Sequence, residues 1–128
     1  MLVVLDTNVL VSAFWSKSSI PATVLGLALD GKVKPCFDDR ILLEYWSVLM
    51  RPRFNFTEEE VRIVLQAIKE TGISVLPEPL ALKFTDDADR KFYEVAKSCD
   101  ATLITGNLKH FPQEPHIVSP AEFLERYQ

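Results

Sequence analysis

Cysteine and histidine are scarce in this chain, with two residues of each among 128. Cys36 and Cys99 lack the C-x-x-C spacing of redox and zinc motifs, so we expect reduced, buried thiols in a cytoplasmic protein. A disulfide between them stays open as an alternative, although no motif favours it. Since only His110 and His116 could supply imidazole ligands, we do not expect a zinc site.

Long apolar runs are also missing. No stretch approaches the roughly 20 residues that a membrane-spanning helix needs. The first residues do not predict a signal peptide, because Asp6 interrupts the apolar run and no basic segment precedes it. The chain also shows no repeat, low-complexity tract or linker. We therefore expect one domain over residues 1–128, long enough to bury a single core.

Positive charge is in short supply, since 18 acidic residues face 14 Lys and Arg and the net charge is −4. This balance argues against a surface coated with positive charge for non-specific nucleic-acid binding. It leaves room for a local basic patch that holds phosphates, and it makes a basic partner protein plausible.

Apolar runs and helical periodicities alternate along the chain. We expect strands over 2–5, 33–37, 73–76, 101–105 and 116–118. Between them we expect helices over 8–15, 20–30, 38–50 and 57–70, one that opens at Thr85 or Asp86, and one that follows Ser119. Capping boxes at 57–60 and 119–122 mark two of the helix starts. The alternation predicts an α/β fold, a three-layer α/β/α sandwich with a parallel sheet of four or five strands.

The first expected strand ends in a carboxylate. The apolar run 2–5 is typical of a buried parallel strand, and Asp6, Thr7 and Asn8 follow it at once. Ligands of open α/β sheets bind at the carboxyl ends of the strands, so Asp6 is expected at the site edge. A buried carboxylate needs a cation, hydrogen-bond donors or a metal. The alternative is that Asp6 or Asn8 simply caps the next helix.

Glu44 is a second candidate, in the helix expected over 38–50. It shares a polar stripe with Arg40, Ser47 and Arg51 at spacings of three and four. On this spacing alone, an exposed Arg40–Glu44 pair is the favoured interpretation. Only other acids nearby would make Glu44 a site residue.

Asp89 is the third candidate. It stands with Asp86 and Asp87 at a helix start, where acids also complement the helix dipole. Asp89 differs because it precedes Phe92 by three residues and therefore borders the buried stripe of that helix.

Thr105 and Asn107 follow the fourth expected strand, and both should project at the same edge of the sheet as Asp6. The alternative for Asn107 is an Asx turn or a helix cap. If these groups meet, two or three carboxylates and an amide share a small space and require a cation. All-oxygen ligands select Mg²⁺ or Mn²⁺, and such an ion can orient water for phosphodiester hydrolysis.

With these residues the chain resembles the PIN-domain ribonucleases, especially the toxin components of toxin–antitoxin pairs (VapC-like). The resemblance covers essentially the whole length. It depends on four features in order: the segment 3–8, Glu44 in a mid-chain helix, Asp86-x-x-Asp89-x-x-Phe92, and the segment 103–107 after a strand.

The resemblance implies a PIN-like α/β/α sandwich and an Mg²⁺- or Mn²⁺-dependent ribonuclease. Asp6, Glu44 and Asp89 correspond to the family's three acids, Thr105 matches its Ser or Thr after strand four, and Asp86 is an auxiliary ligand. Many members carry Asp where this chain has Asn107, which argues against a second tightly held ion. The resemblance also implies a homodimer and a small antitoxin that occludes the site.

Substrate contacts are expected from Asn8, Arg51 and Arg53, since the two arginines follow the Glu44 helix and could hold a phosphate. Trp15 and Trp46 could stack on bases, but their helical spacing favours core packing for both.

Three functions are compatible with these residues. The first is the metal-dependent endoribonuclease, which we favour. The second is a non-catalytic RNA- or protein-binding module on the same fold, which Asn107 keeps open. The third is a phosphatase or phosphoacceptor with Asp6 as nucleophile, although Asn8 stands where haloacid-dehalogenase enzymes carry a second Asp.

Overall fold

A computed structural model of the chain describes residues 1–80 and 87–127. Its strands are β1 (Leu2–Leu5), β2 (Lys34–Phe37), β3 (Ile73–Ser74), β4 (Thr102–Ile104) and β5 (Ile117–Val118). They form one parallel sheet in the order β3-β2-β1-β4-β5. Since β1 is central, the carboxyl ends of β1, β2 and β4 lie next to one another.

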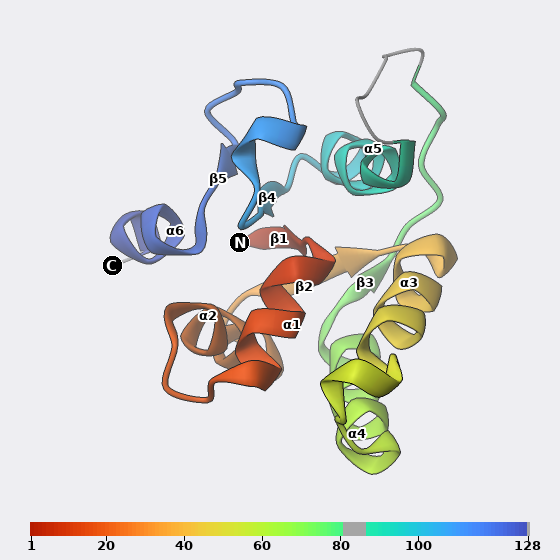
Figure 1. Ribbon diagram of the computed structural model, residues 1–128. Coiled ribbons are helices and arrows are strands. Elements are labelled where there is room, and N and C mark those ends of the chain that lie inside the picture. The colour runs from red at the N-terminus through yellow and green to blue at the C-terminus, as the bar shows by residue number, and fades with distance from the viewer. Residues whose placement is uncertain (81–86, 128) are drawn as a thin grey trace.

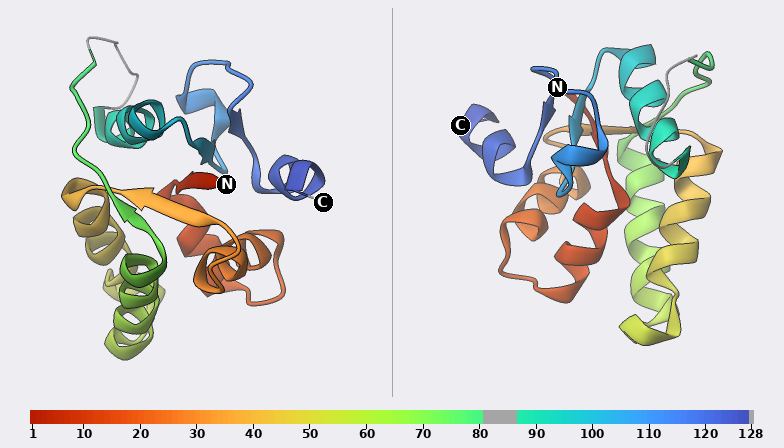
Figure 2. Two further views of the ribbon diagram at one scale, coloured as in Figure 1. Left: turned by 180° about the vertical axis from the view of Figure 1, so that it is seen from behind. Right: turned by 45° about the horizontal axis from the view of Figure 1, so that its top comes forward.

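Helices cover both faces of this sheet. They are α1 (Thr7–Trp15), α2 (Ile20–Leu29), α3 (Asp39–Leu49), α4 (Glu58–Thr71), α5 (Arg90–Cys99) and α6 (Pro120–Tyr127), with short 3-10 turns η1 (Pro52–Phe54), η2 (Asp87–Asp89) and η3 (Leu108–His110). Helix α5 packs over β1, β2 and β4, whereas α1 and α2 lie on the opposite face (Figure 1). Helices α3 and α4 run side by side as an arm below the β2–β3 end of the sheet (Figure 2). The predicted α/β/α sandwich is confirmed, with five strands.

The local signals in the sequence form as expected. Val3, Val4 and Leu5 of β1 are fully buried, as a central parallel strand requires. Thr57 and Glu60 cap each other's backbone at the start of α4, and Asp38 caps α3 through the Ile41 N–H at 3.0 Å. None of the described helices combines the length and apolar character needed to cross a bilayer.

Two element boundaries differ from the prediction by more than one residue. Strand β3 ends at Ser74 instead of residue 76, because its partner β2 ends at Phe37, opposite Ser74, and only the Val75 N–H still reaches the Phe37 carbonyl at 2.8 Å. The helix expected to open at Thr85 or Asp86 has its predicted start outside the described residues. The described helix α5 begins at Arg90, after η2.

The core packing predicted for Trp15 is wrong. Its side chain is 66% exposed and contacts the rings of Phe54 and Phe56 at the surface. The buried stripe of α1 runs through Val9 and Ala13, and Trp15 at the helix end falls off this stripe. Trp46, in contrast, is partly buried against the core.

Both cysteines are free thiols. Cys36 is buried in β2, and Cys99 is partly buried at the end of α5. Burial and the neighbouring Cys99 raise the pKa of the Cys36 thiol to about 12, so this thiol stays protonated and unreactive at neutral pH.

Candidate active site

Asp6 lies at the carboxyl end of β1 and is only 6% exposed. The register pairs Leu5 with Ile104, which places Asp6 beside Thr105 at the end of β4. The Asp6 carboxylate accepts hydrogen bonds from Thr105 Oγ1 at 2.8 Å and from Asn8 Nδ2 at 3.3 Å. Within the described part of the chain it makes no capping bond to the first turn of α1. Asp6 thus occupies the N-cap position of α1, but its carboxylate makes no capping hydrogen bond and faces the edge of the sheet.

Three acids from distant parts of the chain act on one another at this edge. The pKa of Asp6 is raised to about 6. Burial is the largest cause and the charges of Asp89 and Glu44 add to it, against the lowering effects of the Thr105 hydroxyl and the Thr7 backbone. The structure thus brings Asp6, Glu44 and Asp89 into one electrostatic neighbourhood. The acids are spread out. Among residues 1–80 and 87–127, no three His, Cys, Asp or Glu side chains lie close enough together to bind a metal ion by themselves.

Glu44 projects from α3 toward the starts of α1 and α5. Its Oε2 accepts a hydrogen bond from Thr7 Oγ1, and its Oε1 lies 2.6 Å from Lys91 Nζ. The spacing predicted an exposed Arg40–Glu44 pair, and this prediction is wrong. The Arg40 guanidinium instead pairs with Asp38 at 2.7 Å and with Glu94 at 2.8 Å. The Glu94 side chain is 3% exposed and that of Glu44 is 24% exposed, so the Glu94 carboxylate requires a cation more strongly.

Asp89 is the last residue of η2, and its side chain is 14% exposed. Its Oδ2 lies 3.2 Å from His110 Nδ1. Asn107 reaches the acids indirectly. Its backbone N–H donates to Thr105 Oγ1 at 2.9 Å, and its amide nitrogen lies 3.1 Å from His110 Nε2. Asn107 therefore supports the loop that carries Thr105 and His110, and its own side chain faces the imidazole.

The expected substrate residues lie in different places. Asn8 joins two loops, since it donates to Asp6 and accepts from the Gly106 N–H at 3.0 Å. Arg51 lines a surface cavity that also contacts Glu44, whereas the Arg53 guanidinium lies over the Phe54 ring at 4.9 Å. Asp86, the expected auxiliary ligand, falls outside the described residues.

The cavity beside Glu44 has a volume of about 550 Å³ and lies between α3 and the start of α5. Much of its lining is basic or hydroxylic, from residues Arg40, Ser47, Arg51, Arg90 and Lys91. The polar stripe of α3 that the sequence placed in solvent thus forms one wall of a groove that leads to an acid of the cluster. Such a groove suits a chain of phosphates.

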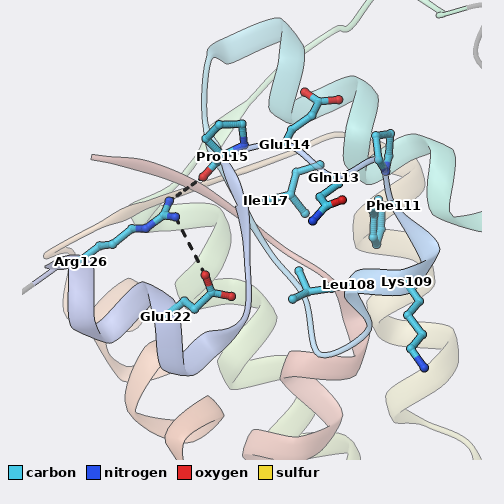
Figure 3. Close-up of a pocket in the computed structure, with 10 residues that line it drawn as sticks. Leu108, Lys109, Phe111, Gln113, Glu114, Pro115, Ile117, Glu122 and Arg126 are labelled. Carbon is cyan, nitrogen blue, oxygen red and sulfur yellow. Dashed lines mark hydrogen bonds and ion pairs between the residues drawn. The ribbon is translucent and has the colours of Figure 1, made fainter.

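A larger cavity of about 630 Å³ lies elsewhere, between η3, β5 and α6. Figure 3 shows Arg126 of α6 directed at the Pro115 carbonyl and at Glu122 across this cavity. Its lining includes none of the three clustered acids, so its size alone does not make it the functional site.

Comparison with known proteins agrees with this geometry. The PIN domain family matches residues 2–109, a span that includes Asp6, Glu44 and Asp89. The chain belongs to the PIN domain family. PIN domains are in general nucleases and typically use divalent metals, so the chain has a nuclease-type fold. It is also similar to the uncharacterized protein MJ1680 of Methanocaldococcus jannaschii, at 28% identity over 141 aligned positions that cover 98% of this chain and 91% of the relative.

Sequence reasoning missed two contacts in this PIN domain. Lys91 follows Asp89 by two residues, and nothing in that spacing predicts that its ammonium reaches Glu44. His110 was considered as a source of imidazole for a zinc site, yet it contacts both Asp89 and Asn107. A signal did exist for Thr7, since it stands between Asp6 and Asn8 in the first motif of the chain.

Proposed function

We propose that this PIN domain is a divalent-metal-dependent endoribonuclease that hydrolyses RNA phosphodiester bonds. The observation that carries the proposal is the acid cluster at the carboxyl edge of the sheet. There the pKa of Asp6 rises to about 6 through burial and through the charges of Asp89 and Glu44. Acids whose ionised forms are destabilised in this way, so that their pKa is raised, are typical of functional sites.

The donor set fits Mg²⁺ or Mn²⁺. Asp6, Glu44 and Asp89 offer carboxylate oxygens, which hard divalent ions prefer. Because no three of these side chains converge among the described residues, a bound Mg²⁺ would have to take most of its ligands from water, as Mg²⁺ commonly does. A bound ion would supply a positive charge for the phosphate oxygens and an activated water for attack. Asp86 remains a proposed auxiliary ligand on the strength of the family resemblance.

The other residues of the site hold these acids in place. Thr105 and Asn8 donate to the Asp6 carboxylate, and Thr7 donates to Glu44. These hydrogen bonds orient the oxygens before substrate arrives, which is the preorganisation that catalysis requires. Arg51, in the groove beside Glu44, is placed to bind a phosphate of the RNA backbone.

The biological setting that we propose follows from the resemblance to VapC-like proteins. In that setting the protein is the toxin of a toxin–antitoxin pair, acts in the cytoplasm, forms a homodimer and binds a small antitoxin protein. The net charge of −4 is compatible with a basic partner. Sedimentation of the protein alone would test the dimer, since a single monomer peak at micromolar concentration contradicts it.

Substitution of the acids tests the nuclease directly. We expect Asp6→Asn and Asp89→Asn to lower Mn²⁺-dependent cleavage of single-stranded RNA by at least about 100-fold, because each removes a charged ligand from the cluster. Asp100→Asn, an exposed change after α5, is the matched control and should cleave normally. Unchanged cleavage by rigorously purified Asp6→Asn protein, or cleavage that persists in EDTA, would contradict the proposal.

A non-catalytic RNA- or protein-binding module is the second candidate. The specific observation in its favour is Asn107, which faces His110 where many PIN domains carry an acid. This alternative predicts that the protein binds RNA equally well in EDTA and in Mn²⁺ and never shortens it. Membership in the PIN family gives no support to the phosphatase alternative.

A further inference from the structure

Lys91 is a basic residue inside the acid cluster. It lies in the first turn of α5, and its ammonium is 2.6 Å from Glu44 Oε1, with the two side chains only 13% and 24% exposed. The same ammonium donates to the Ala88 carbonyl and lies 5.1 Å from the centre of the Phe92 ring. Three protein groups therefore hold this charge in place, in contrast to a lysine that extends into solvent.

This contact engages a carboxylate oxygen that a metal could otherwise bind. Glu44 Oε2 already accepts the Thr7 hydroxyl, so Lys91 at Oε1 leaves both oxygens of this carboxylate engaged by the chain itself. The ammonium also places one positive charge beside Glu44, one of the two acids whose charges raise the pKa of Asp6. A divalent ion entering the cluster meets both a competitor for Glu44 and a like charge.

We propose that Lys91 is a resident counter-ion of the acid cluster that sets its affinity for divalent metal. In the metal-free protein the ammonium stabilises Glu44, and it must leave Oε1 before that oxygen can bind an ion. The released side chain has a place to go, because Lys91 also lines the 550 Å³ groove beside Glu44. This inference rests on the proposed metal site and adds a residue that controls it.

A purely structural salt bridge would behave differently. If Lys91 only supported the fold, its removal would lower the stability of the metal-free protein and leave metal affinity unchanged or weaker. If Lys91 competes with the metal, its removal must tighten metal binding. The direction of the change in affinity therefore separates the two roles.

The test is calorimetric titration of metal-free protein with Mn²⁺ at low ionic strength. We expect Lys91→Met to bind Mn²⁺ about tenfold more tightly than wild type, the effect of deleting a nearby like charge in a partly buried site. Lys91→Arg keeps the charge and should stay within about twofold of wild type. Lys69→Met, on the exposed face of α4, makes the same change of net charge at a distance and should not alter affinity. Unchanged or weaker binding by Lys91→Met overturns the inference.

A structure of the wild-type protein soaked with Mn²⁺ covers the case in which Lys91→Met does not fold. We expect Lys91 Nζ to lie beyond 4 Å from Glu44 Oε1 once the ion is bound. An ion held by Glu44 with the 2.6 Å contact intact would overturn the inference. The nuclease itself is judged separately, by RNA cleavage and its loss in Asp6→Asn. Tighter Mn²⁺ binding by Lys91→Met without any RNA cleavage would thus support Lys91 as counter-ion and contradict the proposed enzyme.

Discussion

At the scale of single residues, Asp6 is a carboxyl placed where its ionised form is destabilised. Burial and two neighbouring carboxylates favour the protonated form of Asp6, while the Thr105 hydroxyl favours the ionised form. The first group of effects is stronger, since the pKa rises from 3.8 to about 6. An ionised Asp6 at neutral pH is therefore costly without a cation, and this cost favours metal binding.

The stability of the metal-free protein should depend on the protonation of Asp6. A carboxyl whose pKa is raised on folding contributes stability below its unfolded pKa of 3.8, and loses it as the pH rises through about 6. Asn in its place does not titrate. We therefore expect Asp6→Asn in EDTA to be more stable than wild type at about pH 7.5, by roughly 1–3 kcal/mol, with the difference shrinking toward pH 4.

Urea unfolding at several pH values measures this difference. Asp100→Asn is again the control, because Asp100 is exposed and its left-handed backbone (φ 53°) suits Asn as well as Asp. A less stable Asp6→Asn protein at pH 7.5 would show that the hydrogen bonds from Thr105 and Asn8 outweigh the cost of burying the charge.

At the scale of elements, the junction between α4 and β3 depends on a close approach of backbones. A Cβ at Gly72 would lie 2.2 Å from the Pro35 carbonyl oxygen and 2.7 Å from that of Ile68. Backbone atoms cannot yield to such a contact as a flexible side chain can. Gly26, inside α2, differs, because no described atom lies within 4 Å of the Cβ position there.

Two alanine substitutions should consequently have opposite effects. We expect Gly72→Ala to destabilise the protein by at least roughly 1–3 kcal/mol, because the α4 arm must shift away from β2. Gly26→Ala should stabilise it by about 0.5–1 kcal/mol through the better helix propensity of alanine. Chemical denaturation of both variants measures the pair, and a neutral Gly72→Ala would show that the junction is looser than the structure indicates.

Element starts were predictable from the sequence where the signal is local. The capping boxes at Thr57 and Ser119 involve residues three apart, and both form as expected. The length of β3 was not predictable in this way. The length of β3 depends on where its partner strand β2 ends. The two strands are distant in the chain, so no local signal fixes their pairing.

At the scale of the whole molecule, an ion pair between the half-exposed Arg40 and the buried Glu94 joins the elements that carry two of the acids. Arg40 of α3 contacts Glu94 of α5, whose side chain is 3% exposed and also accepts the Leu80 N–H at 2.8 Å. Glu44 lies four residues after Arg40, and Asp89 lies five residues before Glu94. The pair therefore joins the helix that carries Glu44 to the helix that begins directly after Asp89.

Loss of the Arg40–Glu94 ion pair should lower the free energy of unfolding. We expect Glu94→Gln to cost roughly 2–4 kcal/mol, because it leaves Arg40 with Asp38 alone and removes a charged acceptor from Leu80. Arg40→Met should cost a similar amount, and the double variant less than the sum of the two. Urea unfolding of the three variants at one pH measures the coupling, and strictly additive losses would contradict a direct interaction.

Part of the candidate site was predictable because it follows from topology. A parallel sheet aligns the carboxyl ends of its strands, so Asp6 and Thr105 were expected together, and they bond at 2.8 Å. The partner of Arg40 was mispredicted because spacing along one helix suggests only neighbours on that helix. Trp15 was mispredicted for a related reason, since the aromatic rings that it contacts belong to η1 and its flank.

The sequence by itself determined the fold class, most helix starts and the acids that could form a site, because strand and helix periodicities and capping motifs act over a few residues. Only the tertiary structure decided which charges meet. The Lys91–Glu44 contact joins α5 to α3, and the Arg40–Glu94 contact joins the same two helices at another point. Which opposite charges lie within reach of a long side chain depends on how the helices pack, and packing is a property of the whole molecule.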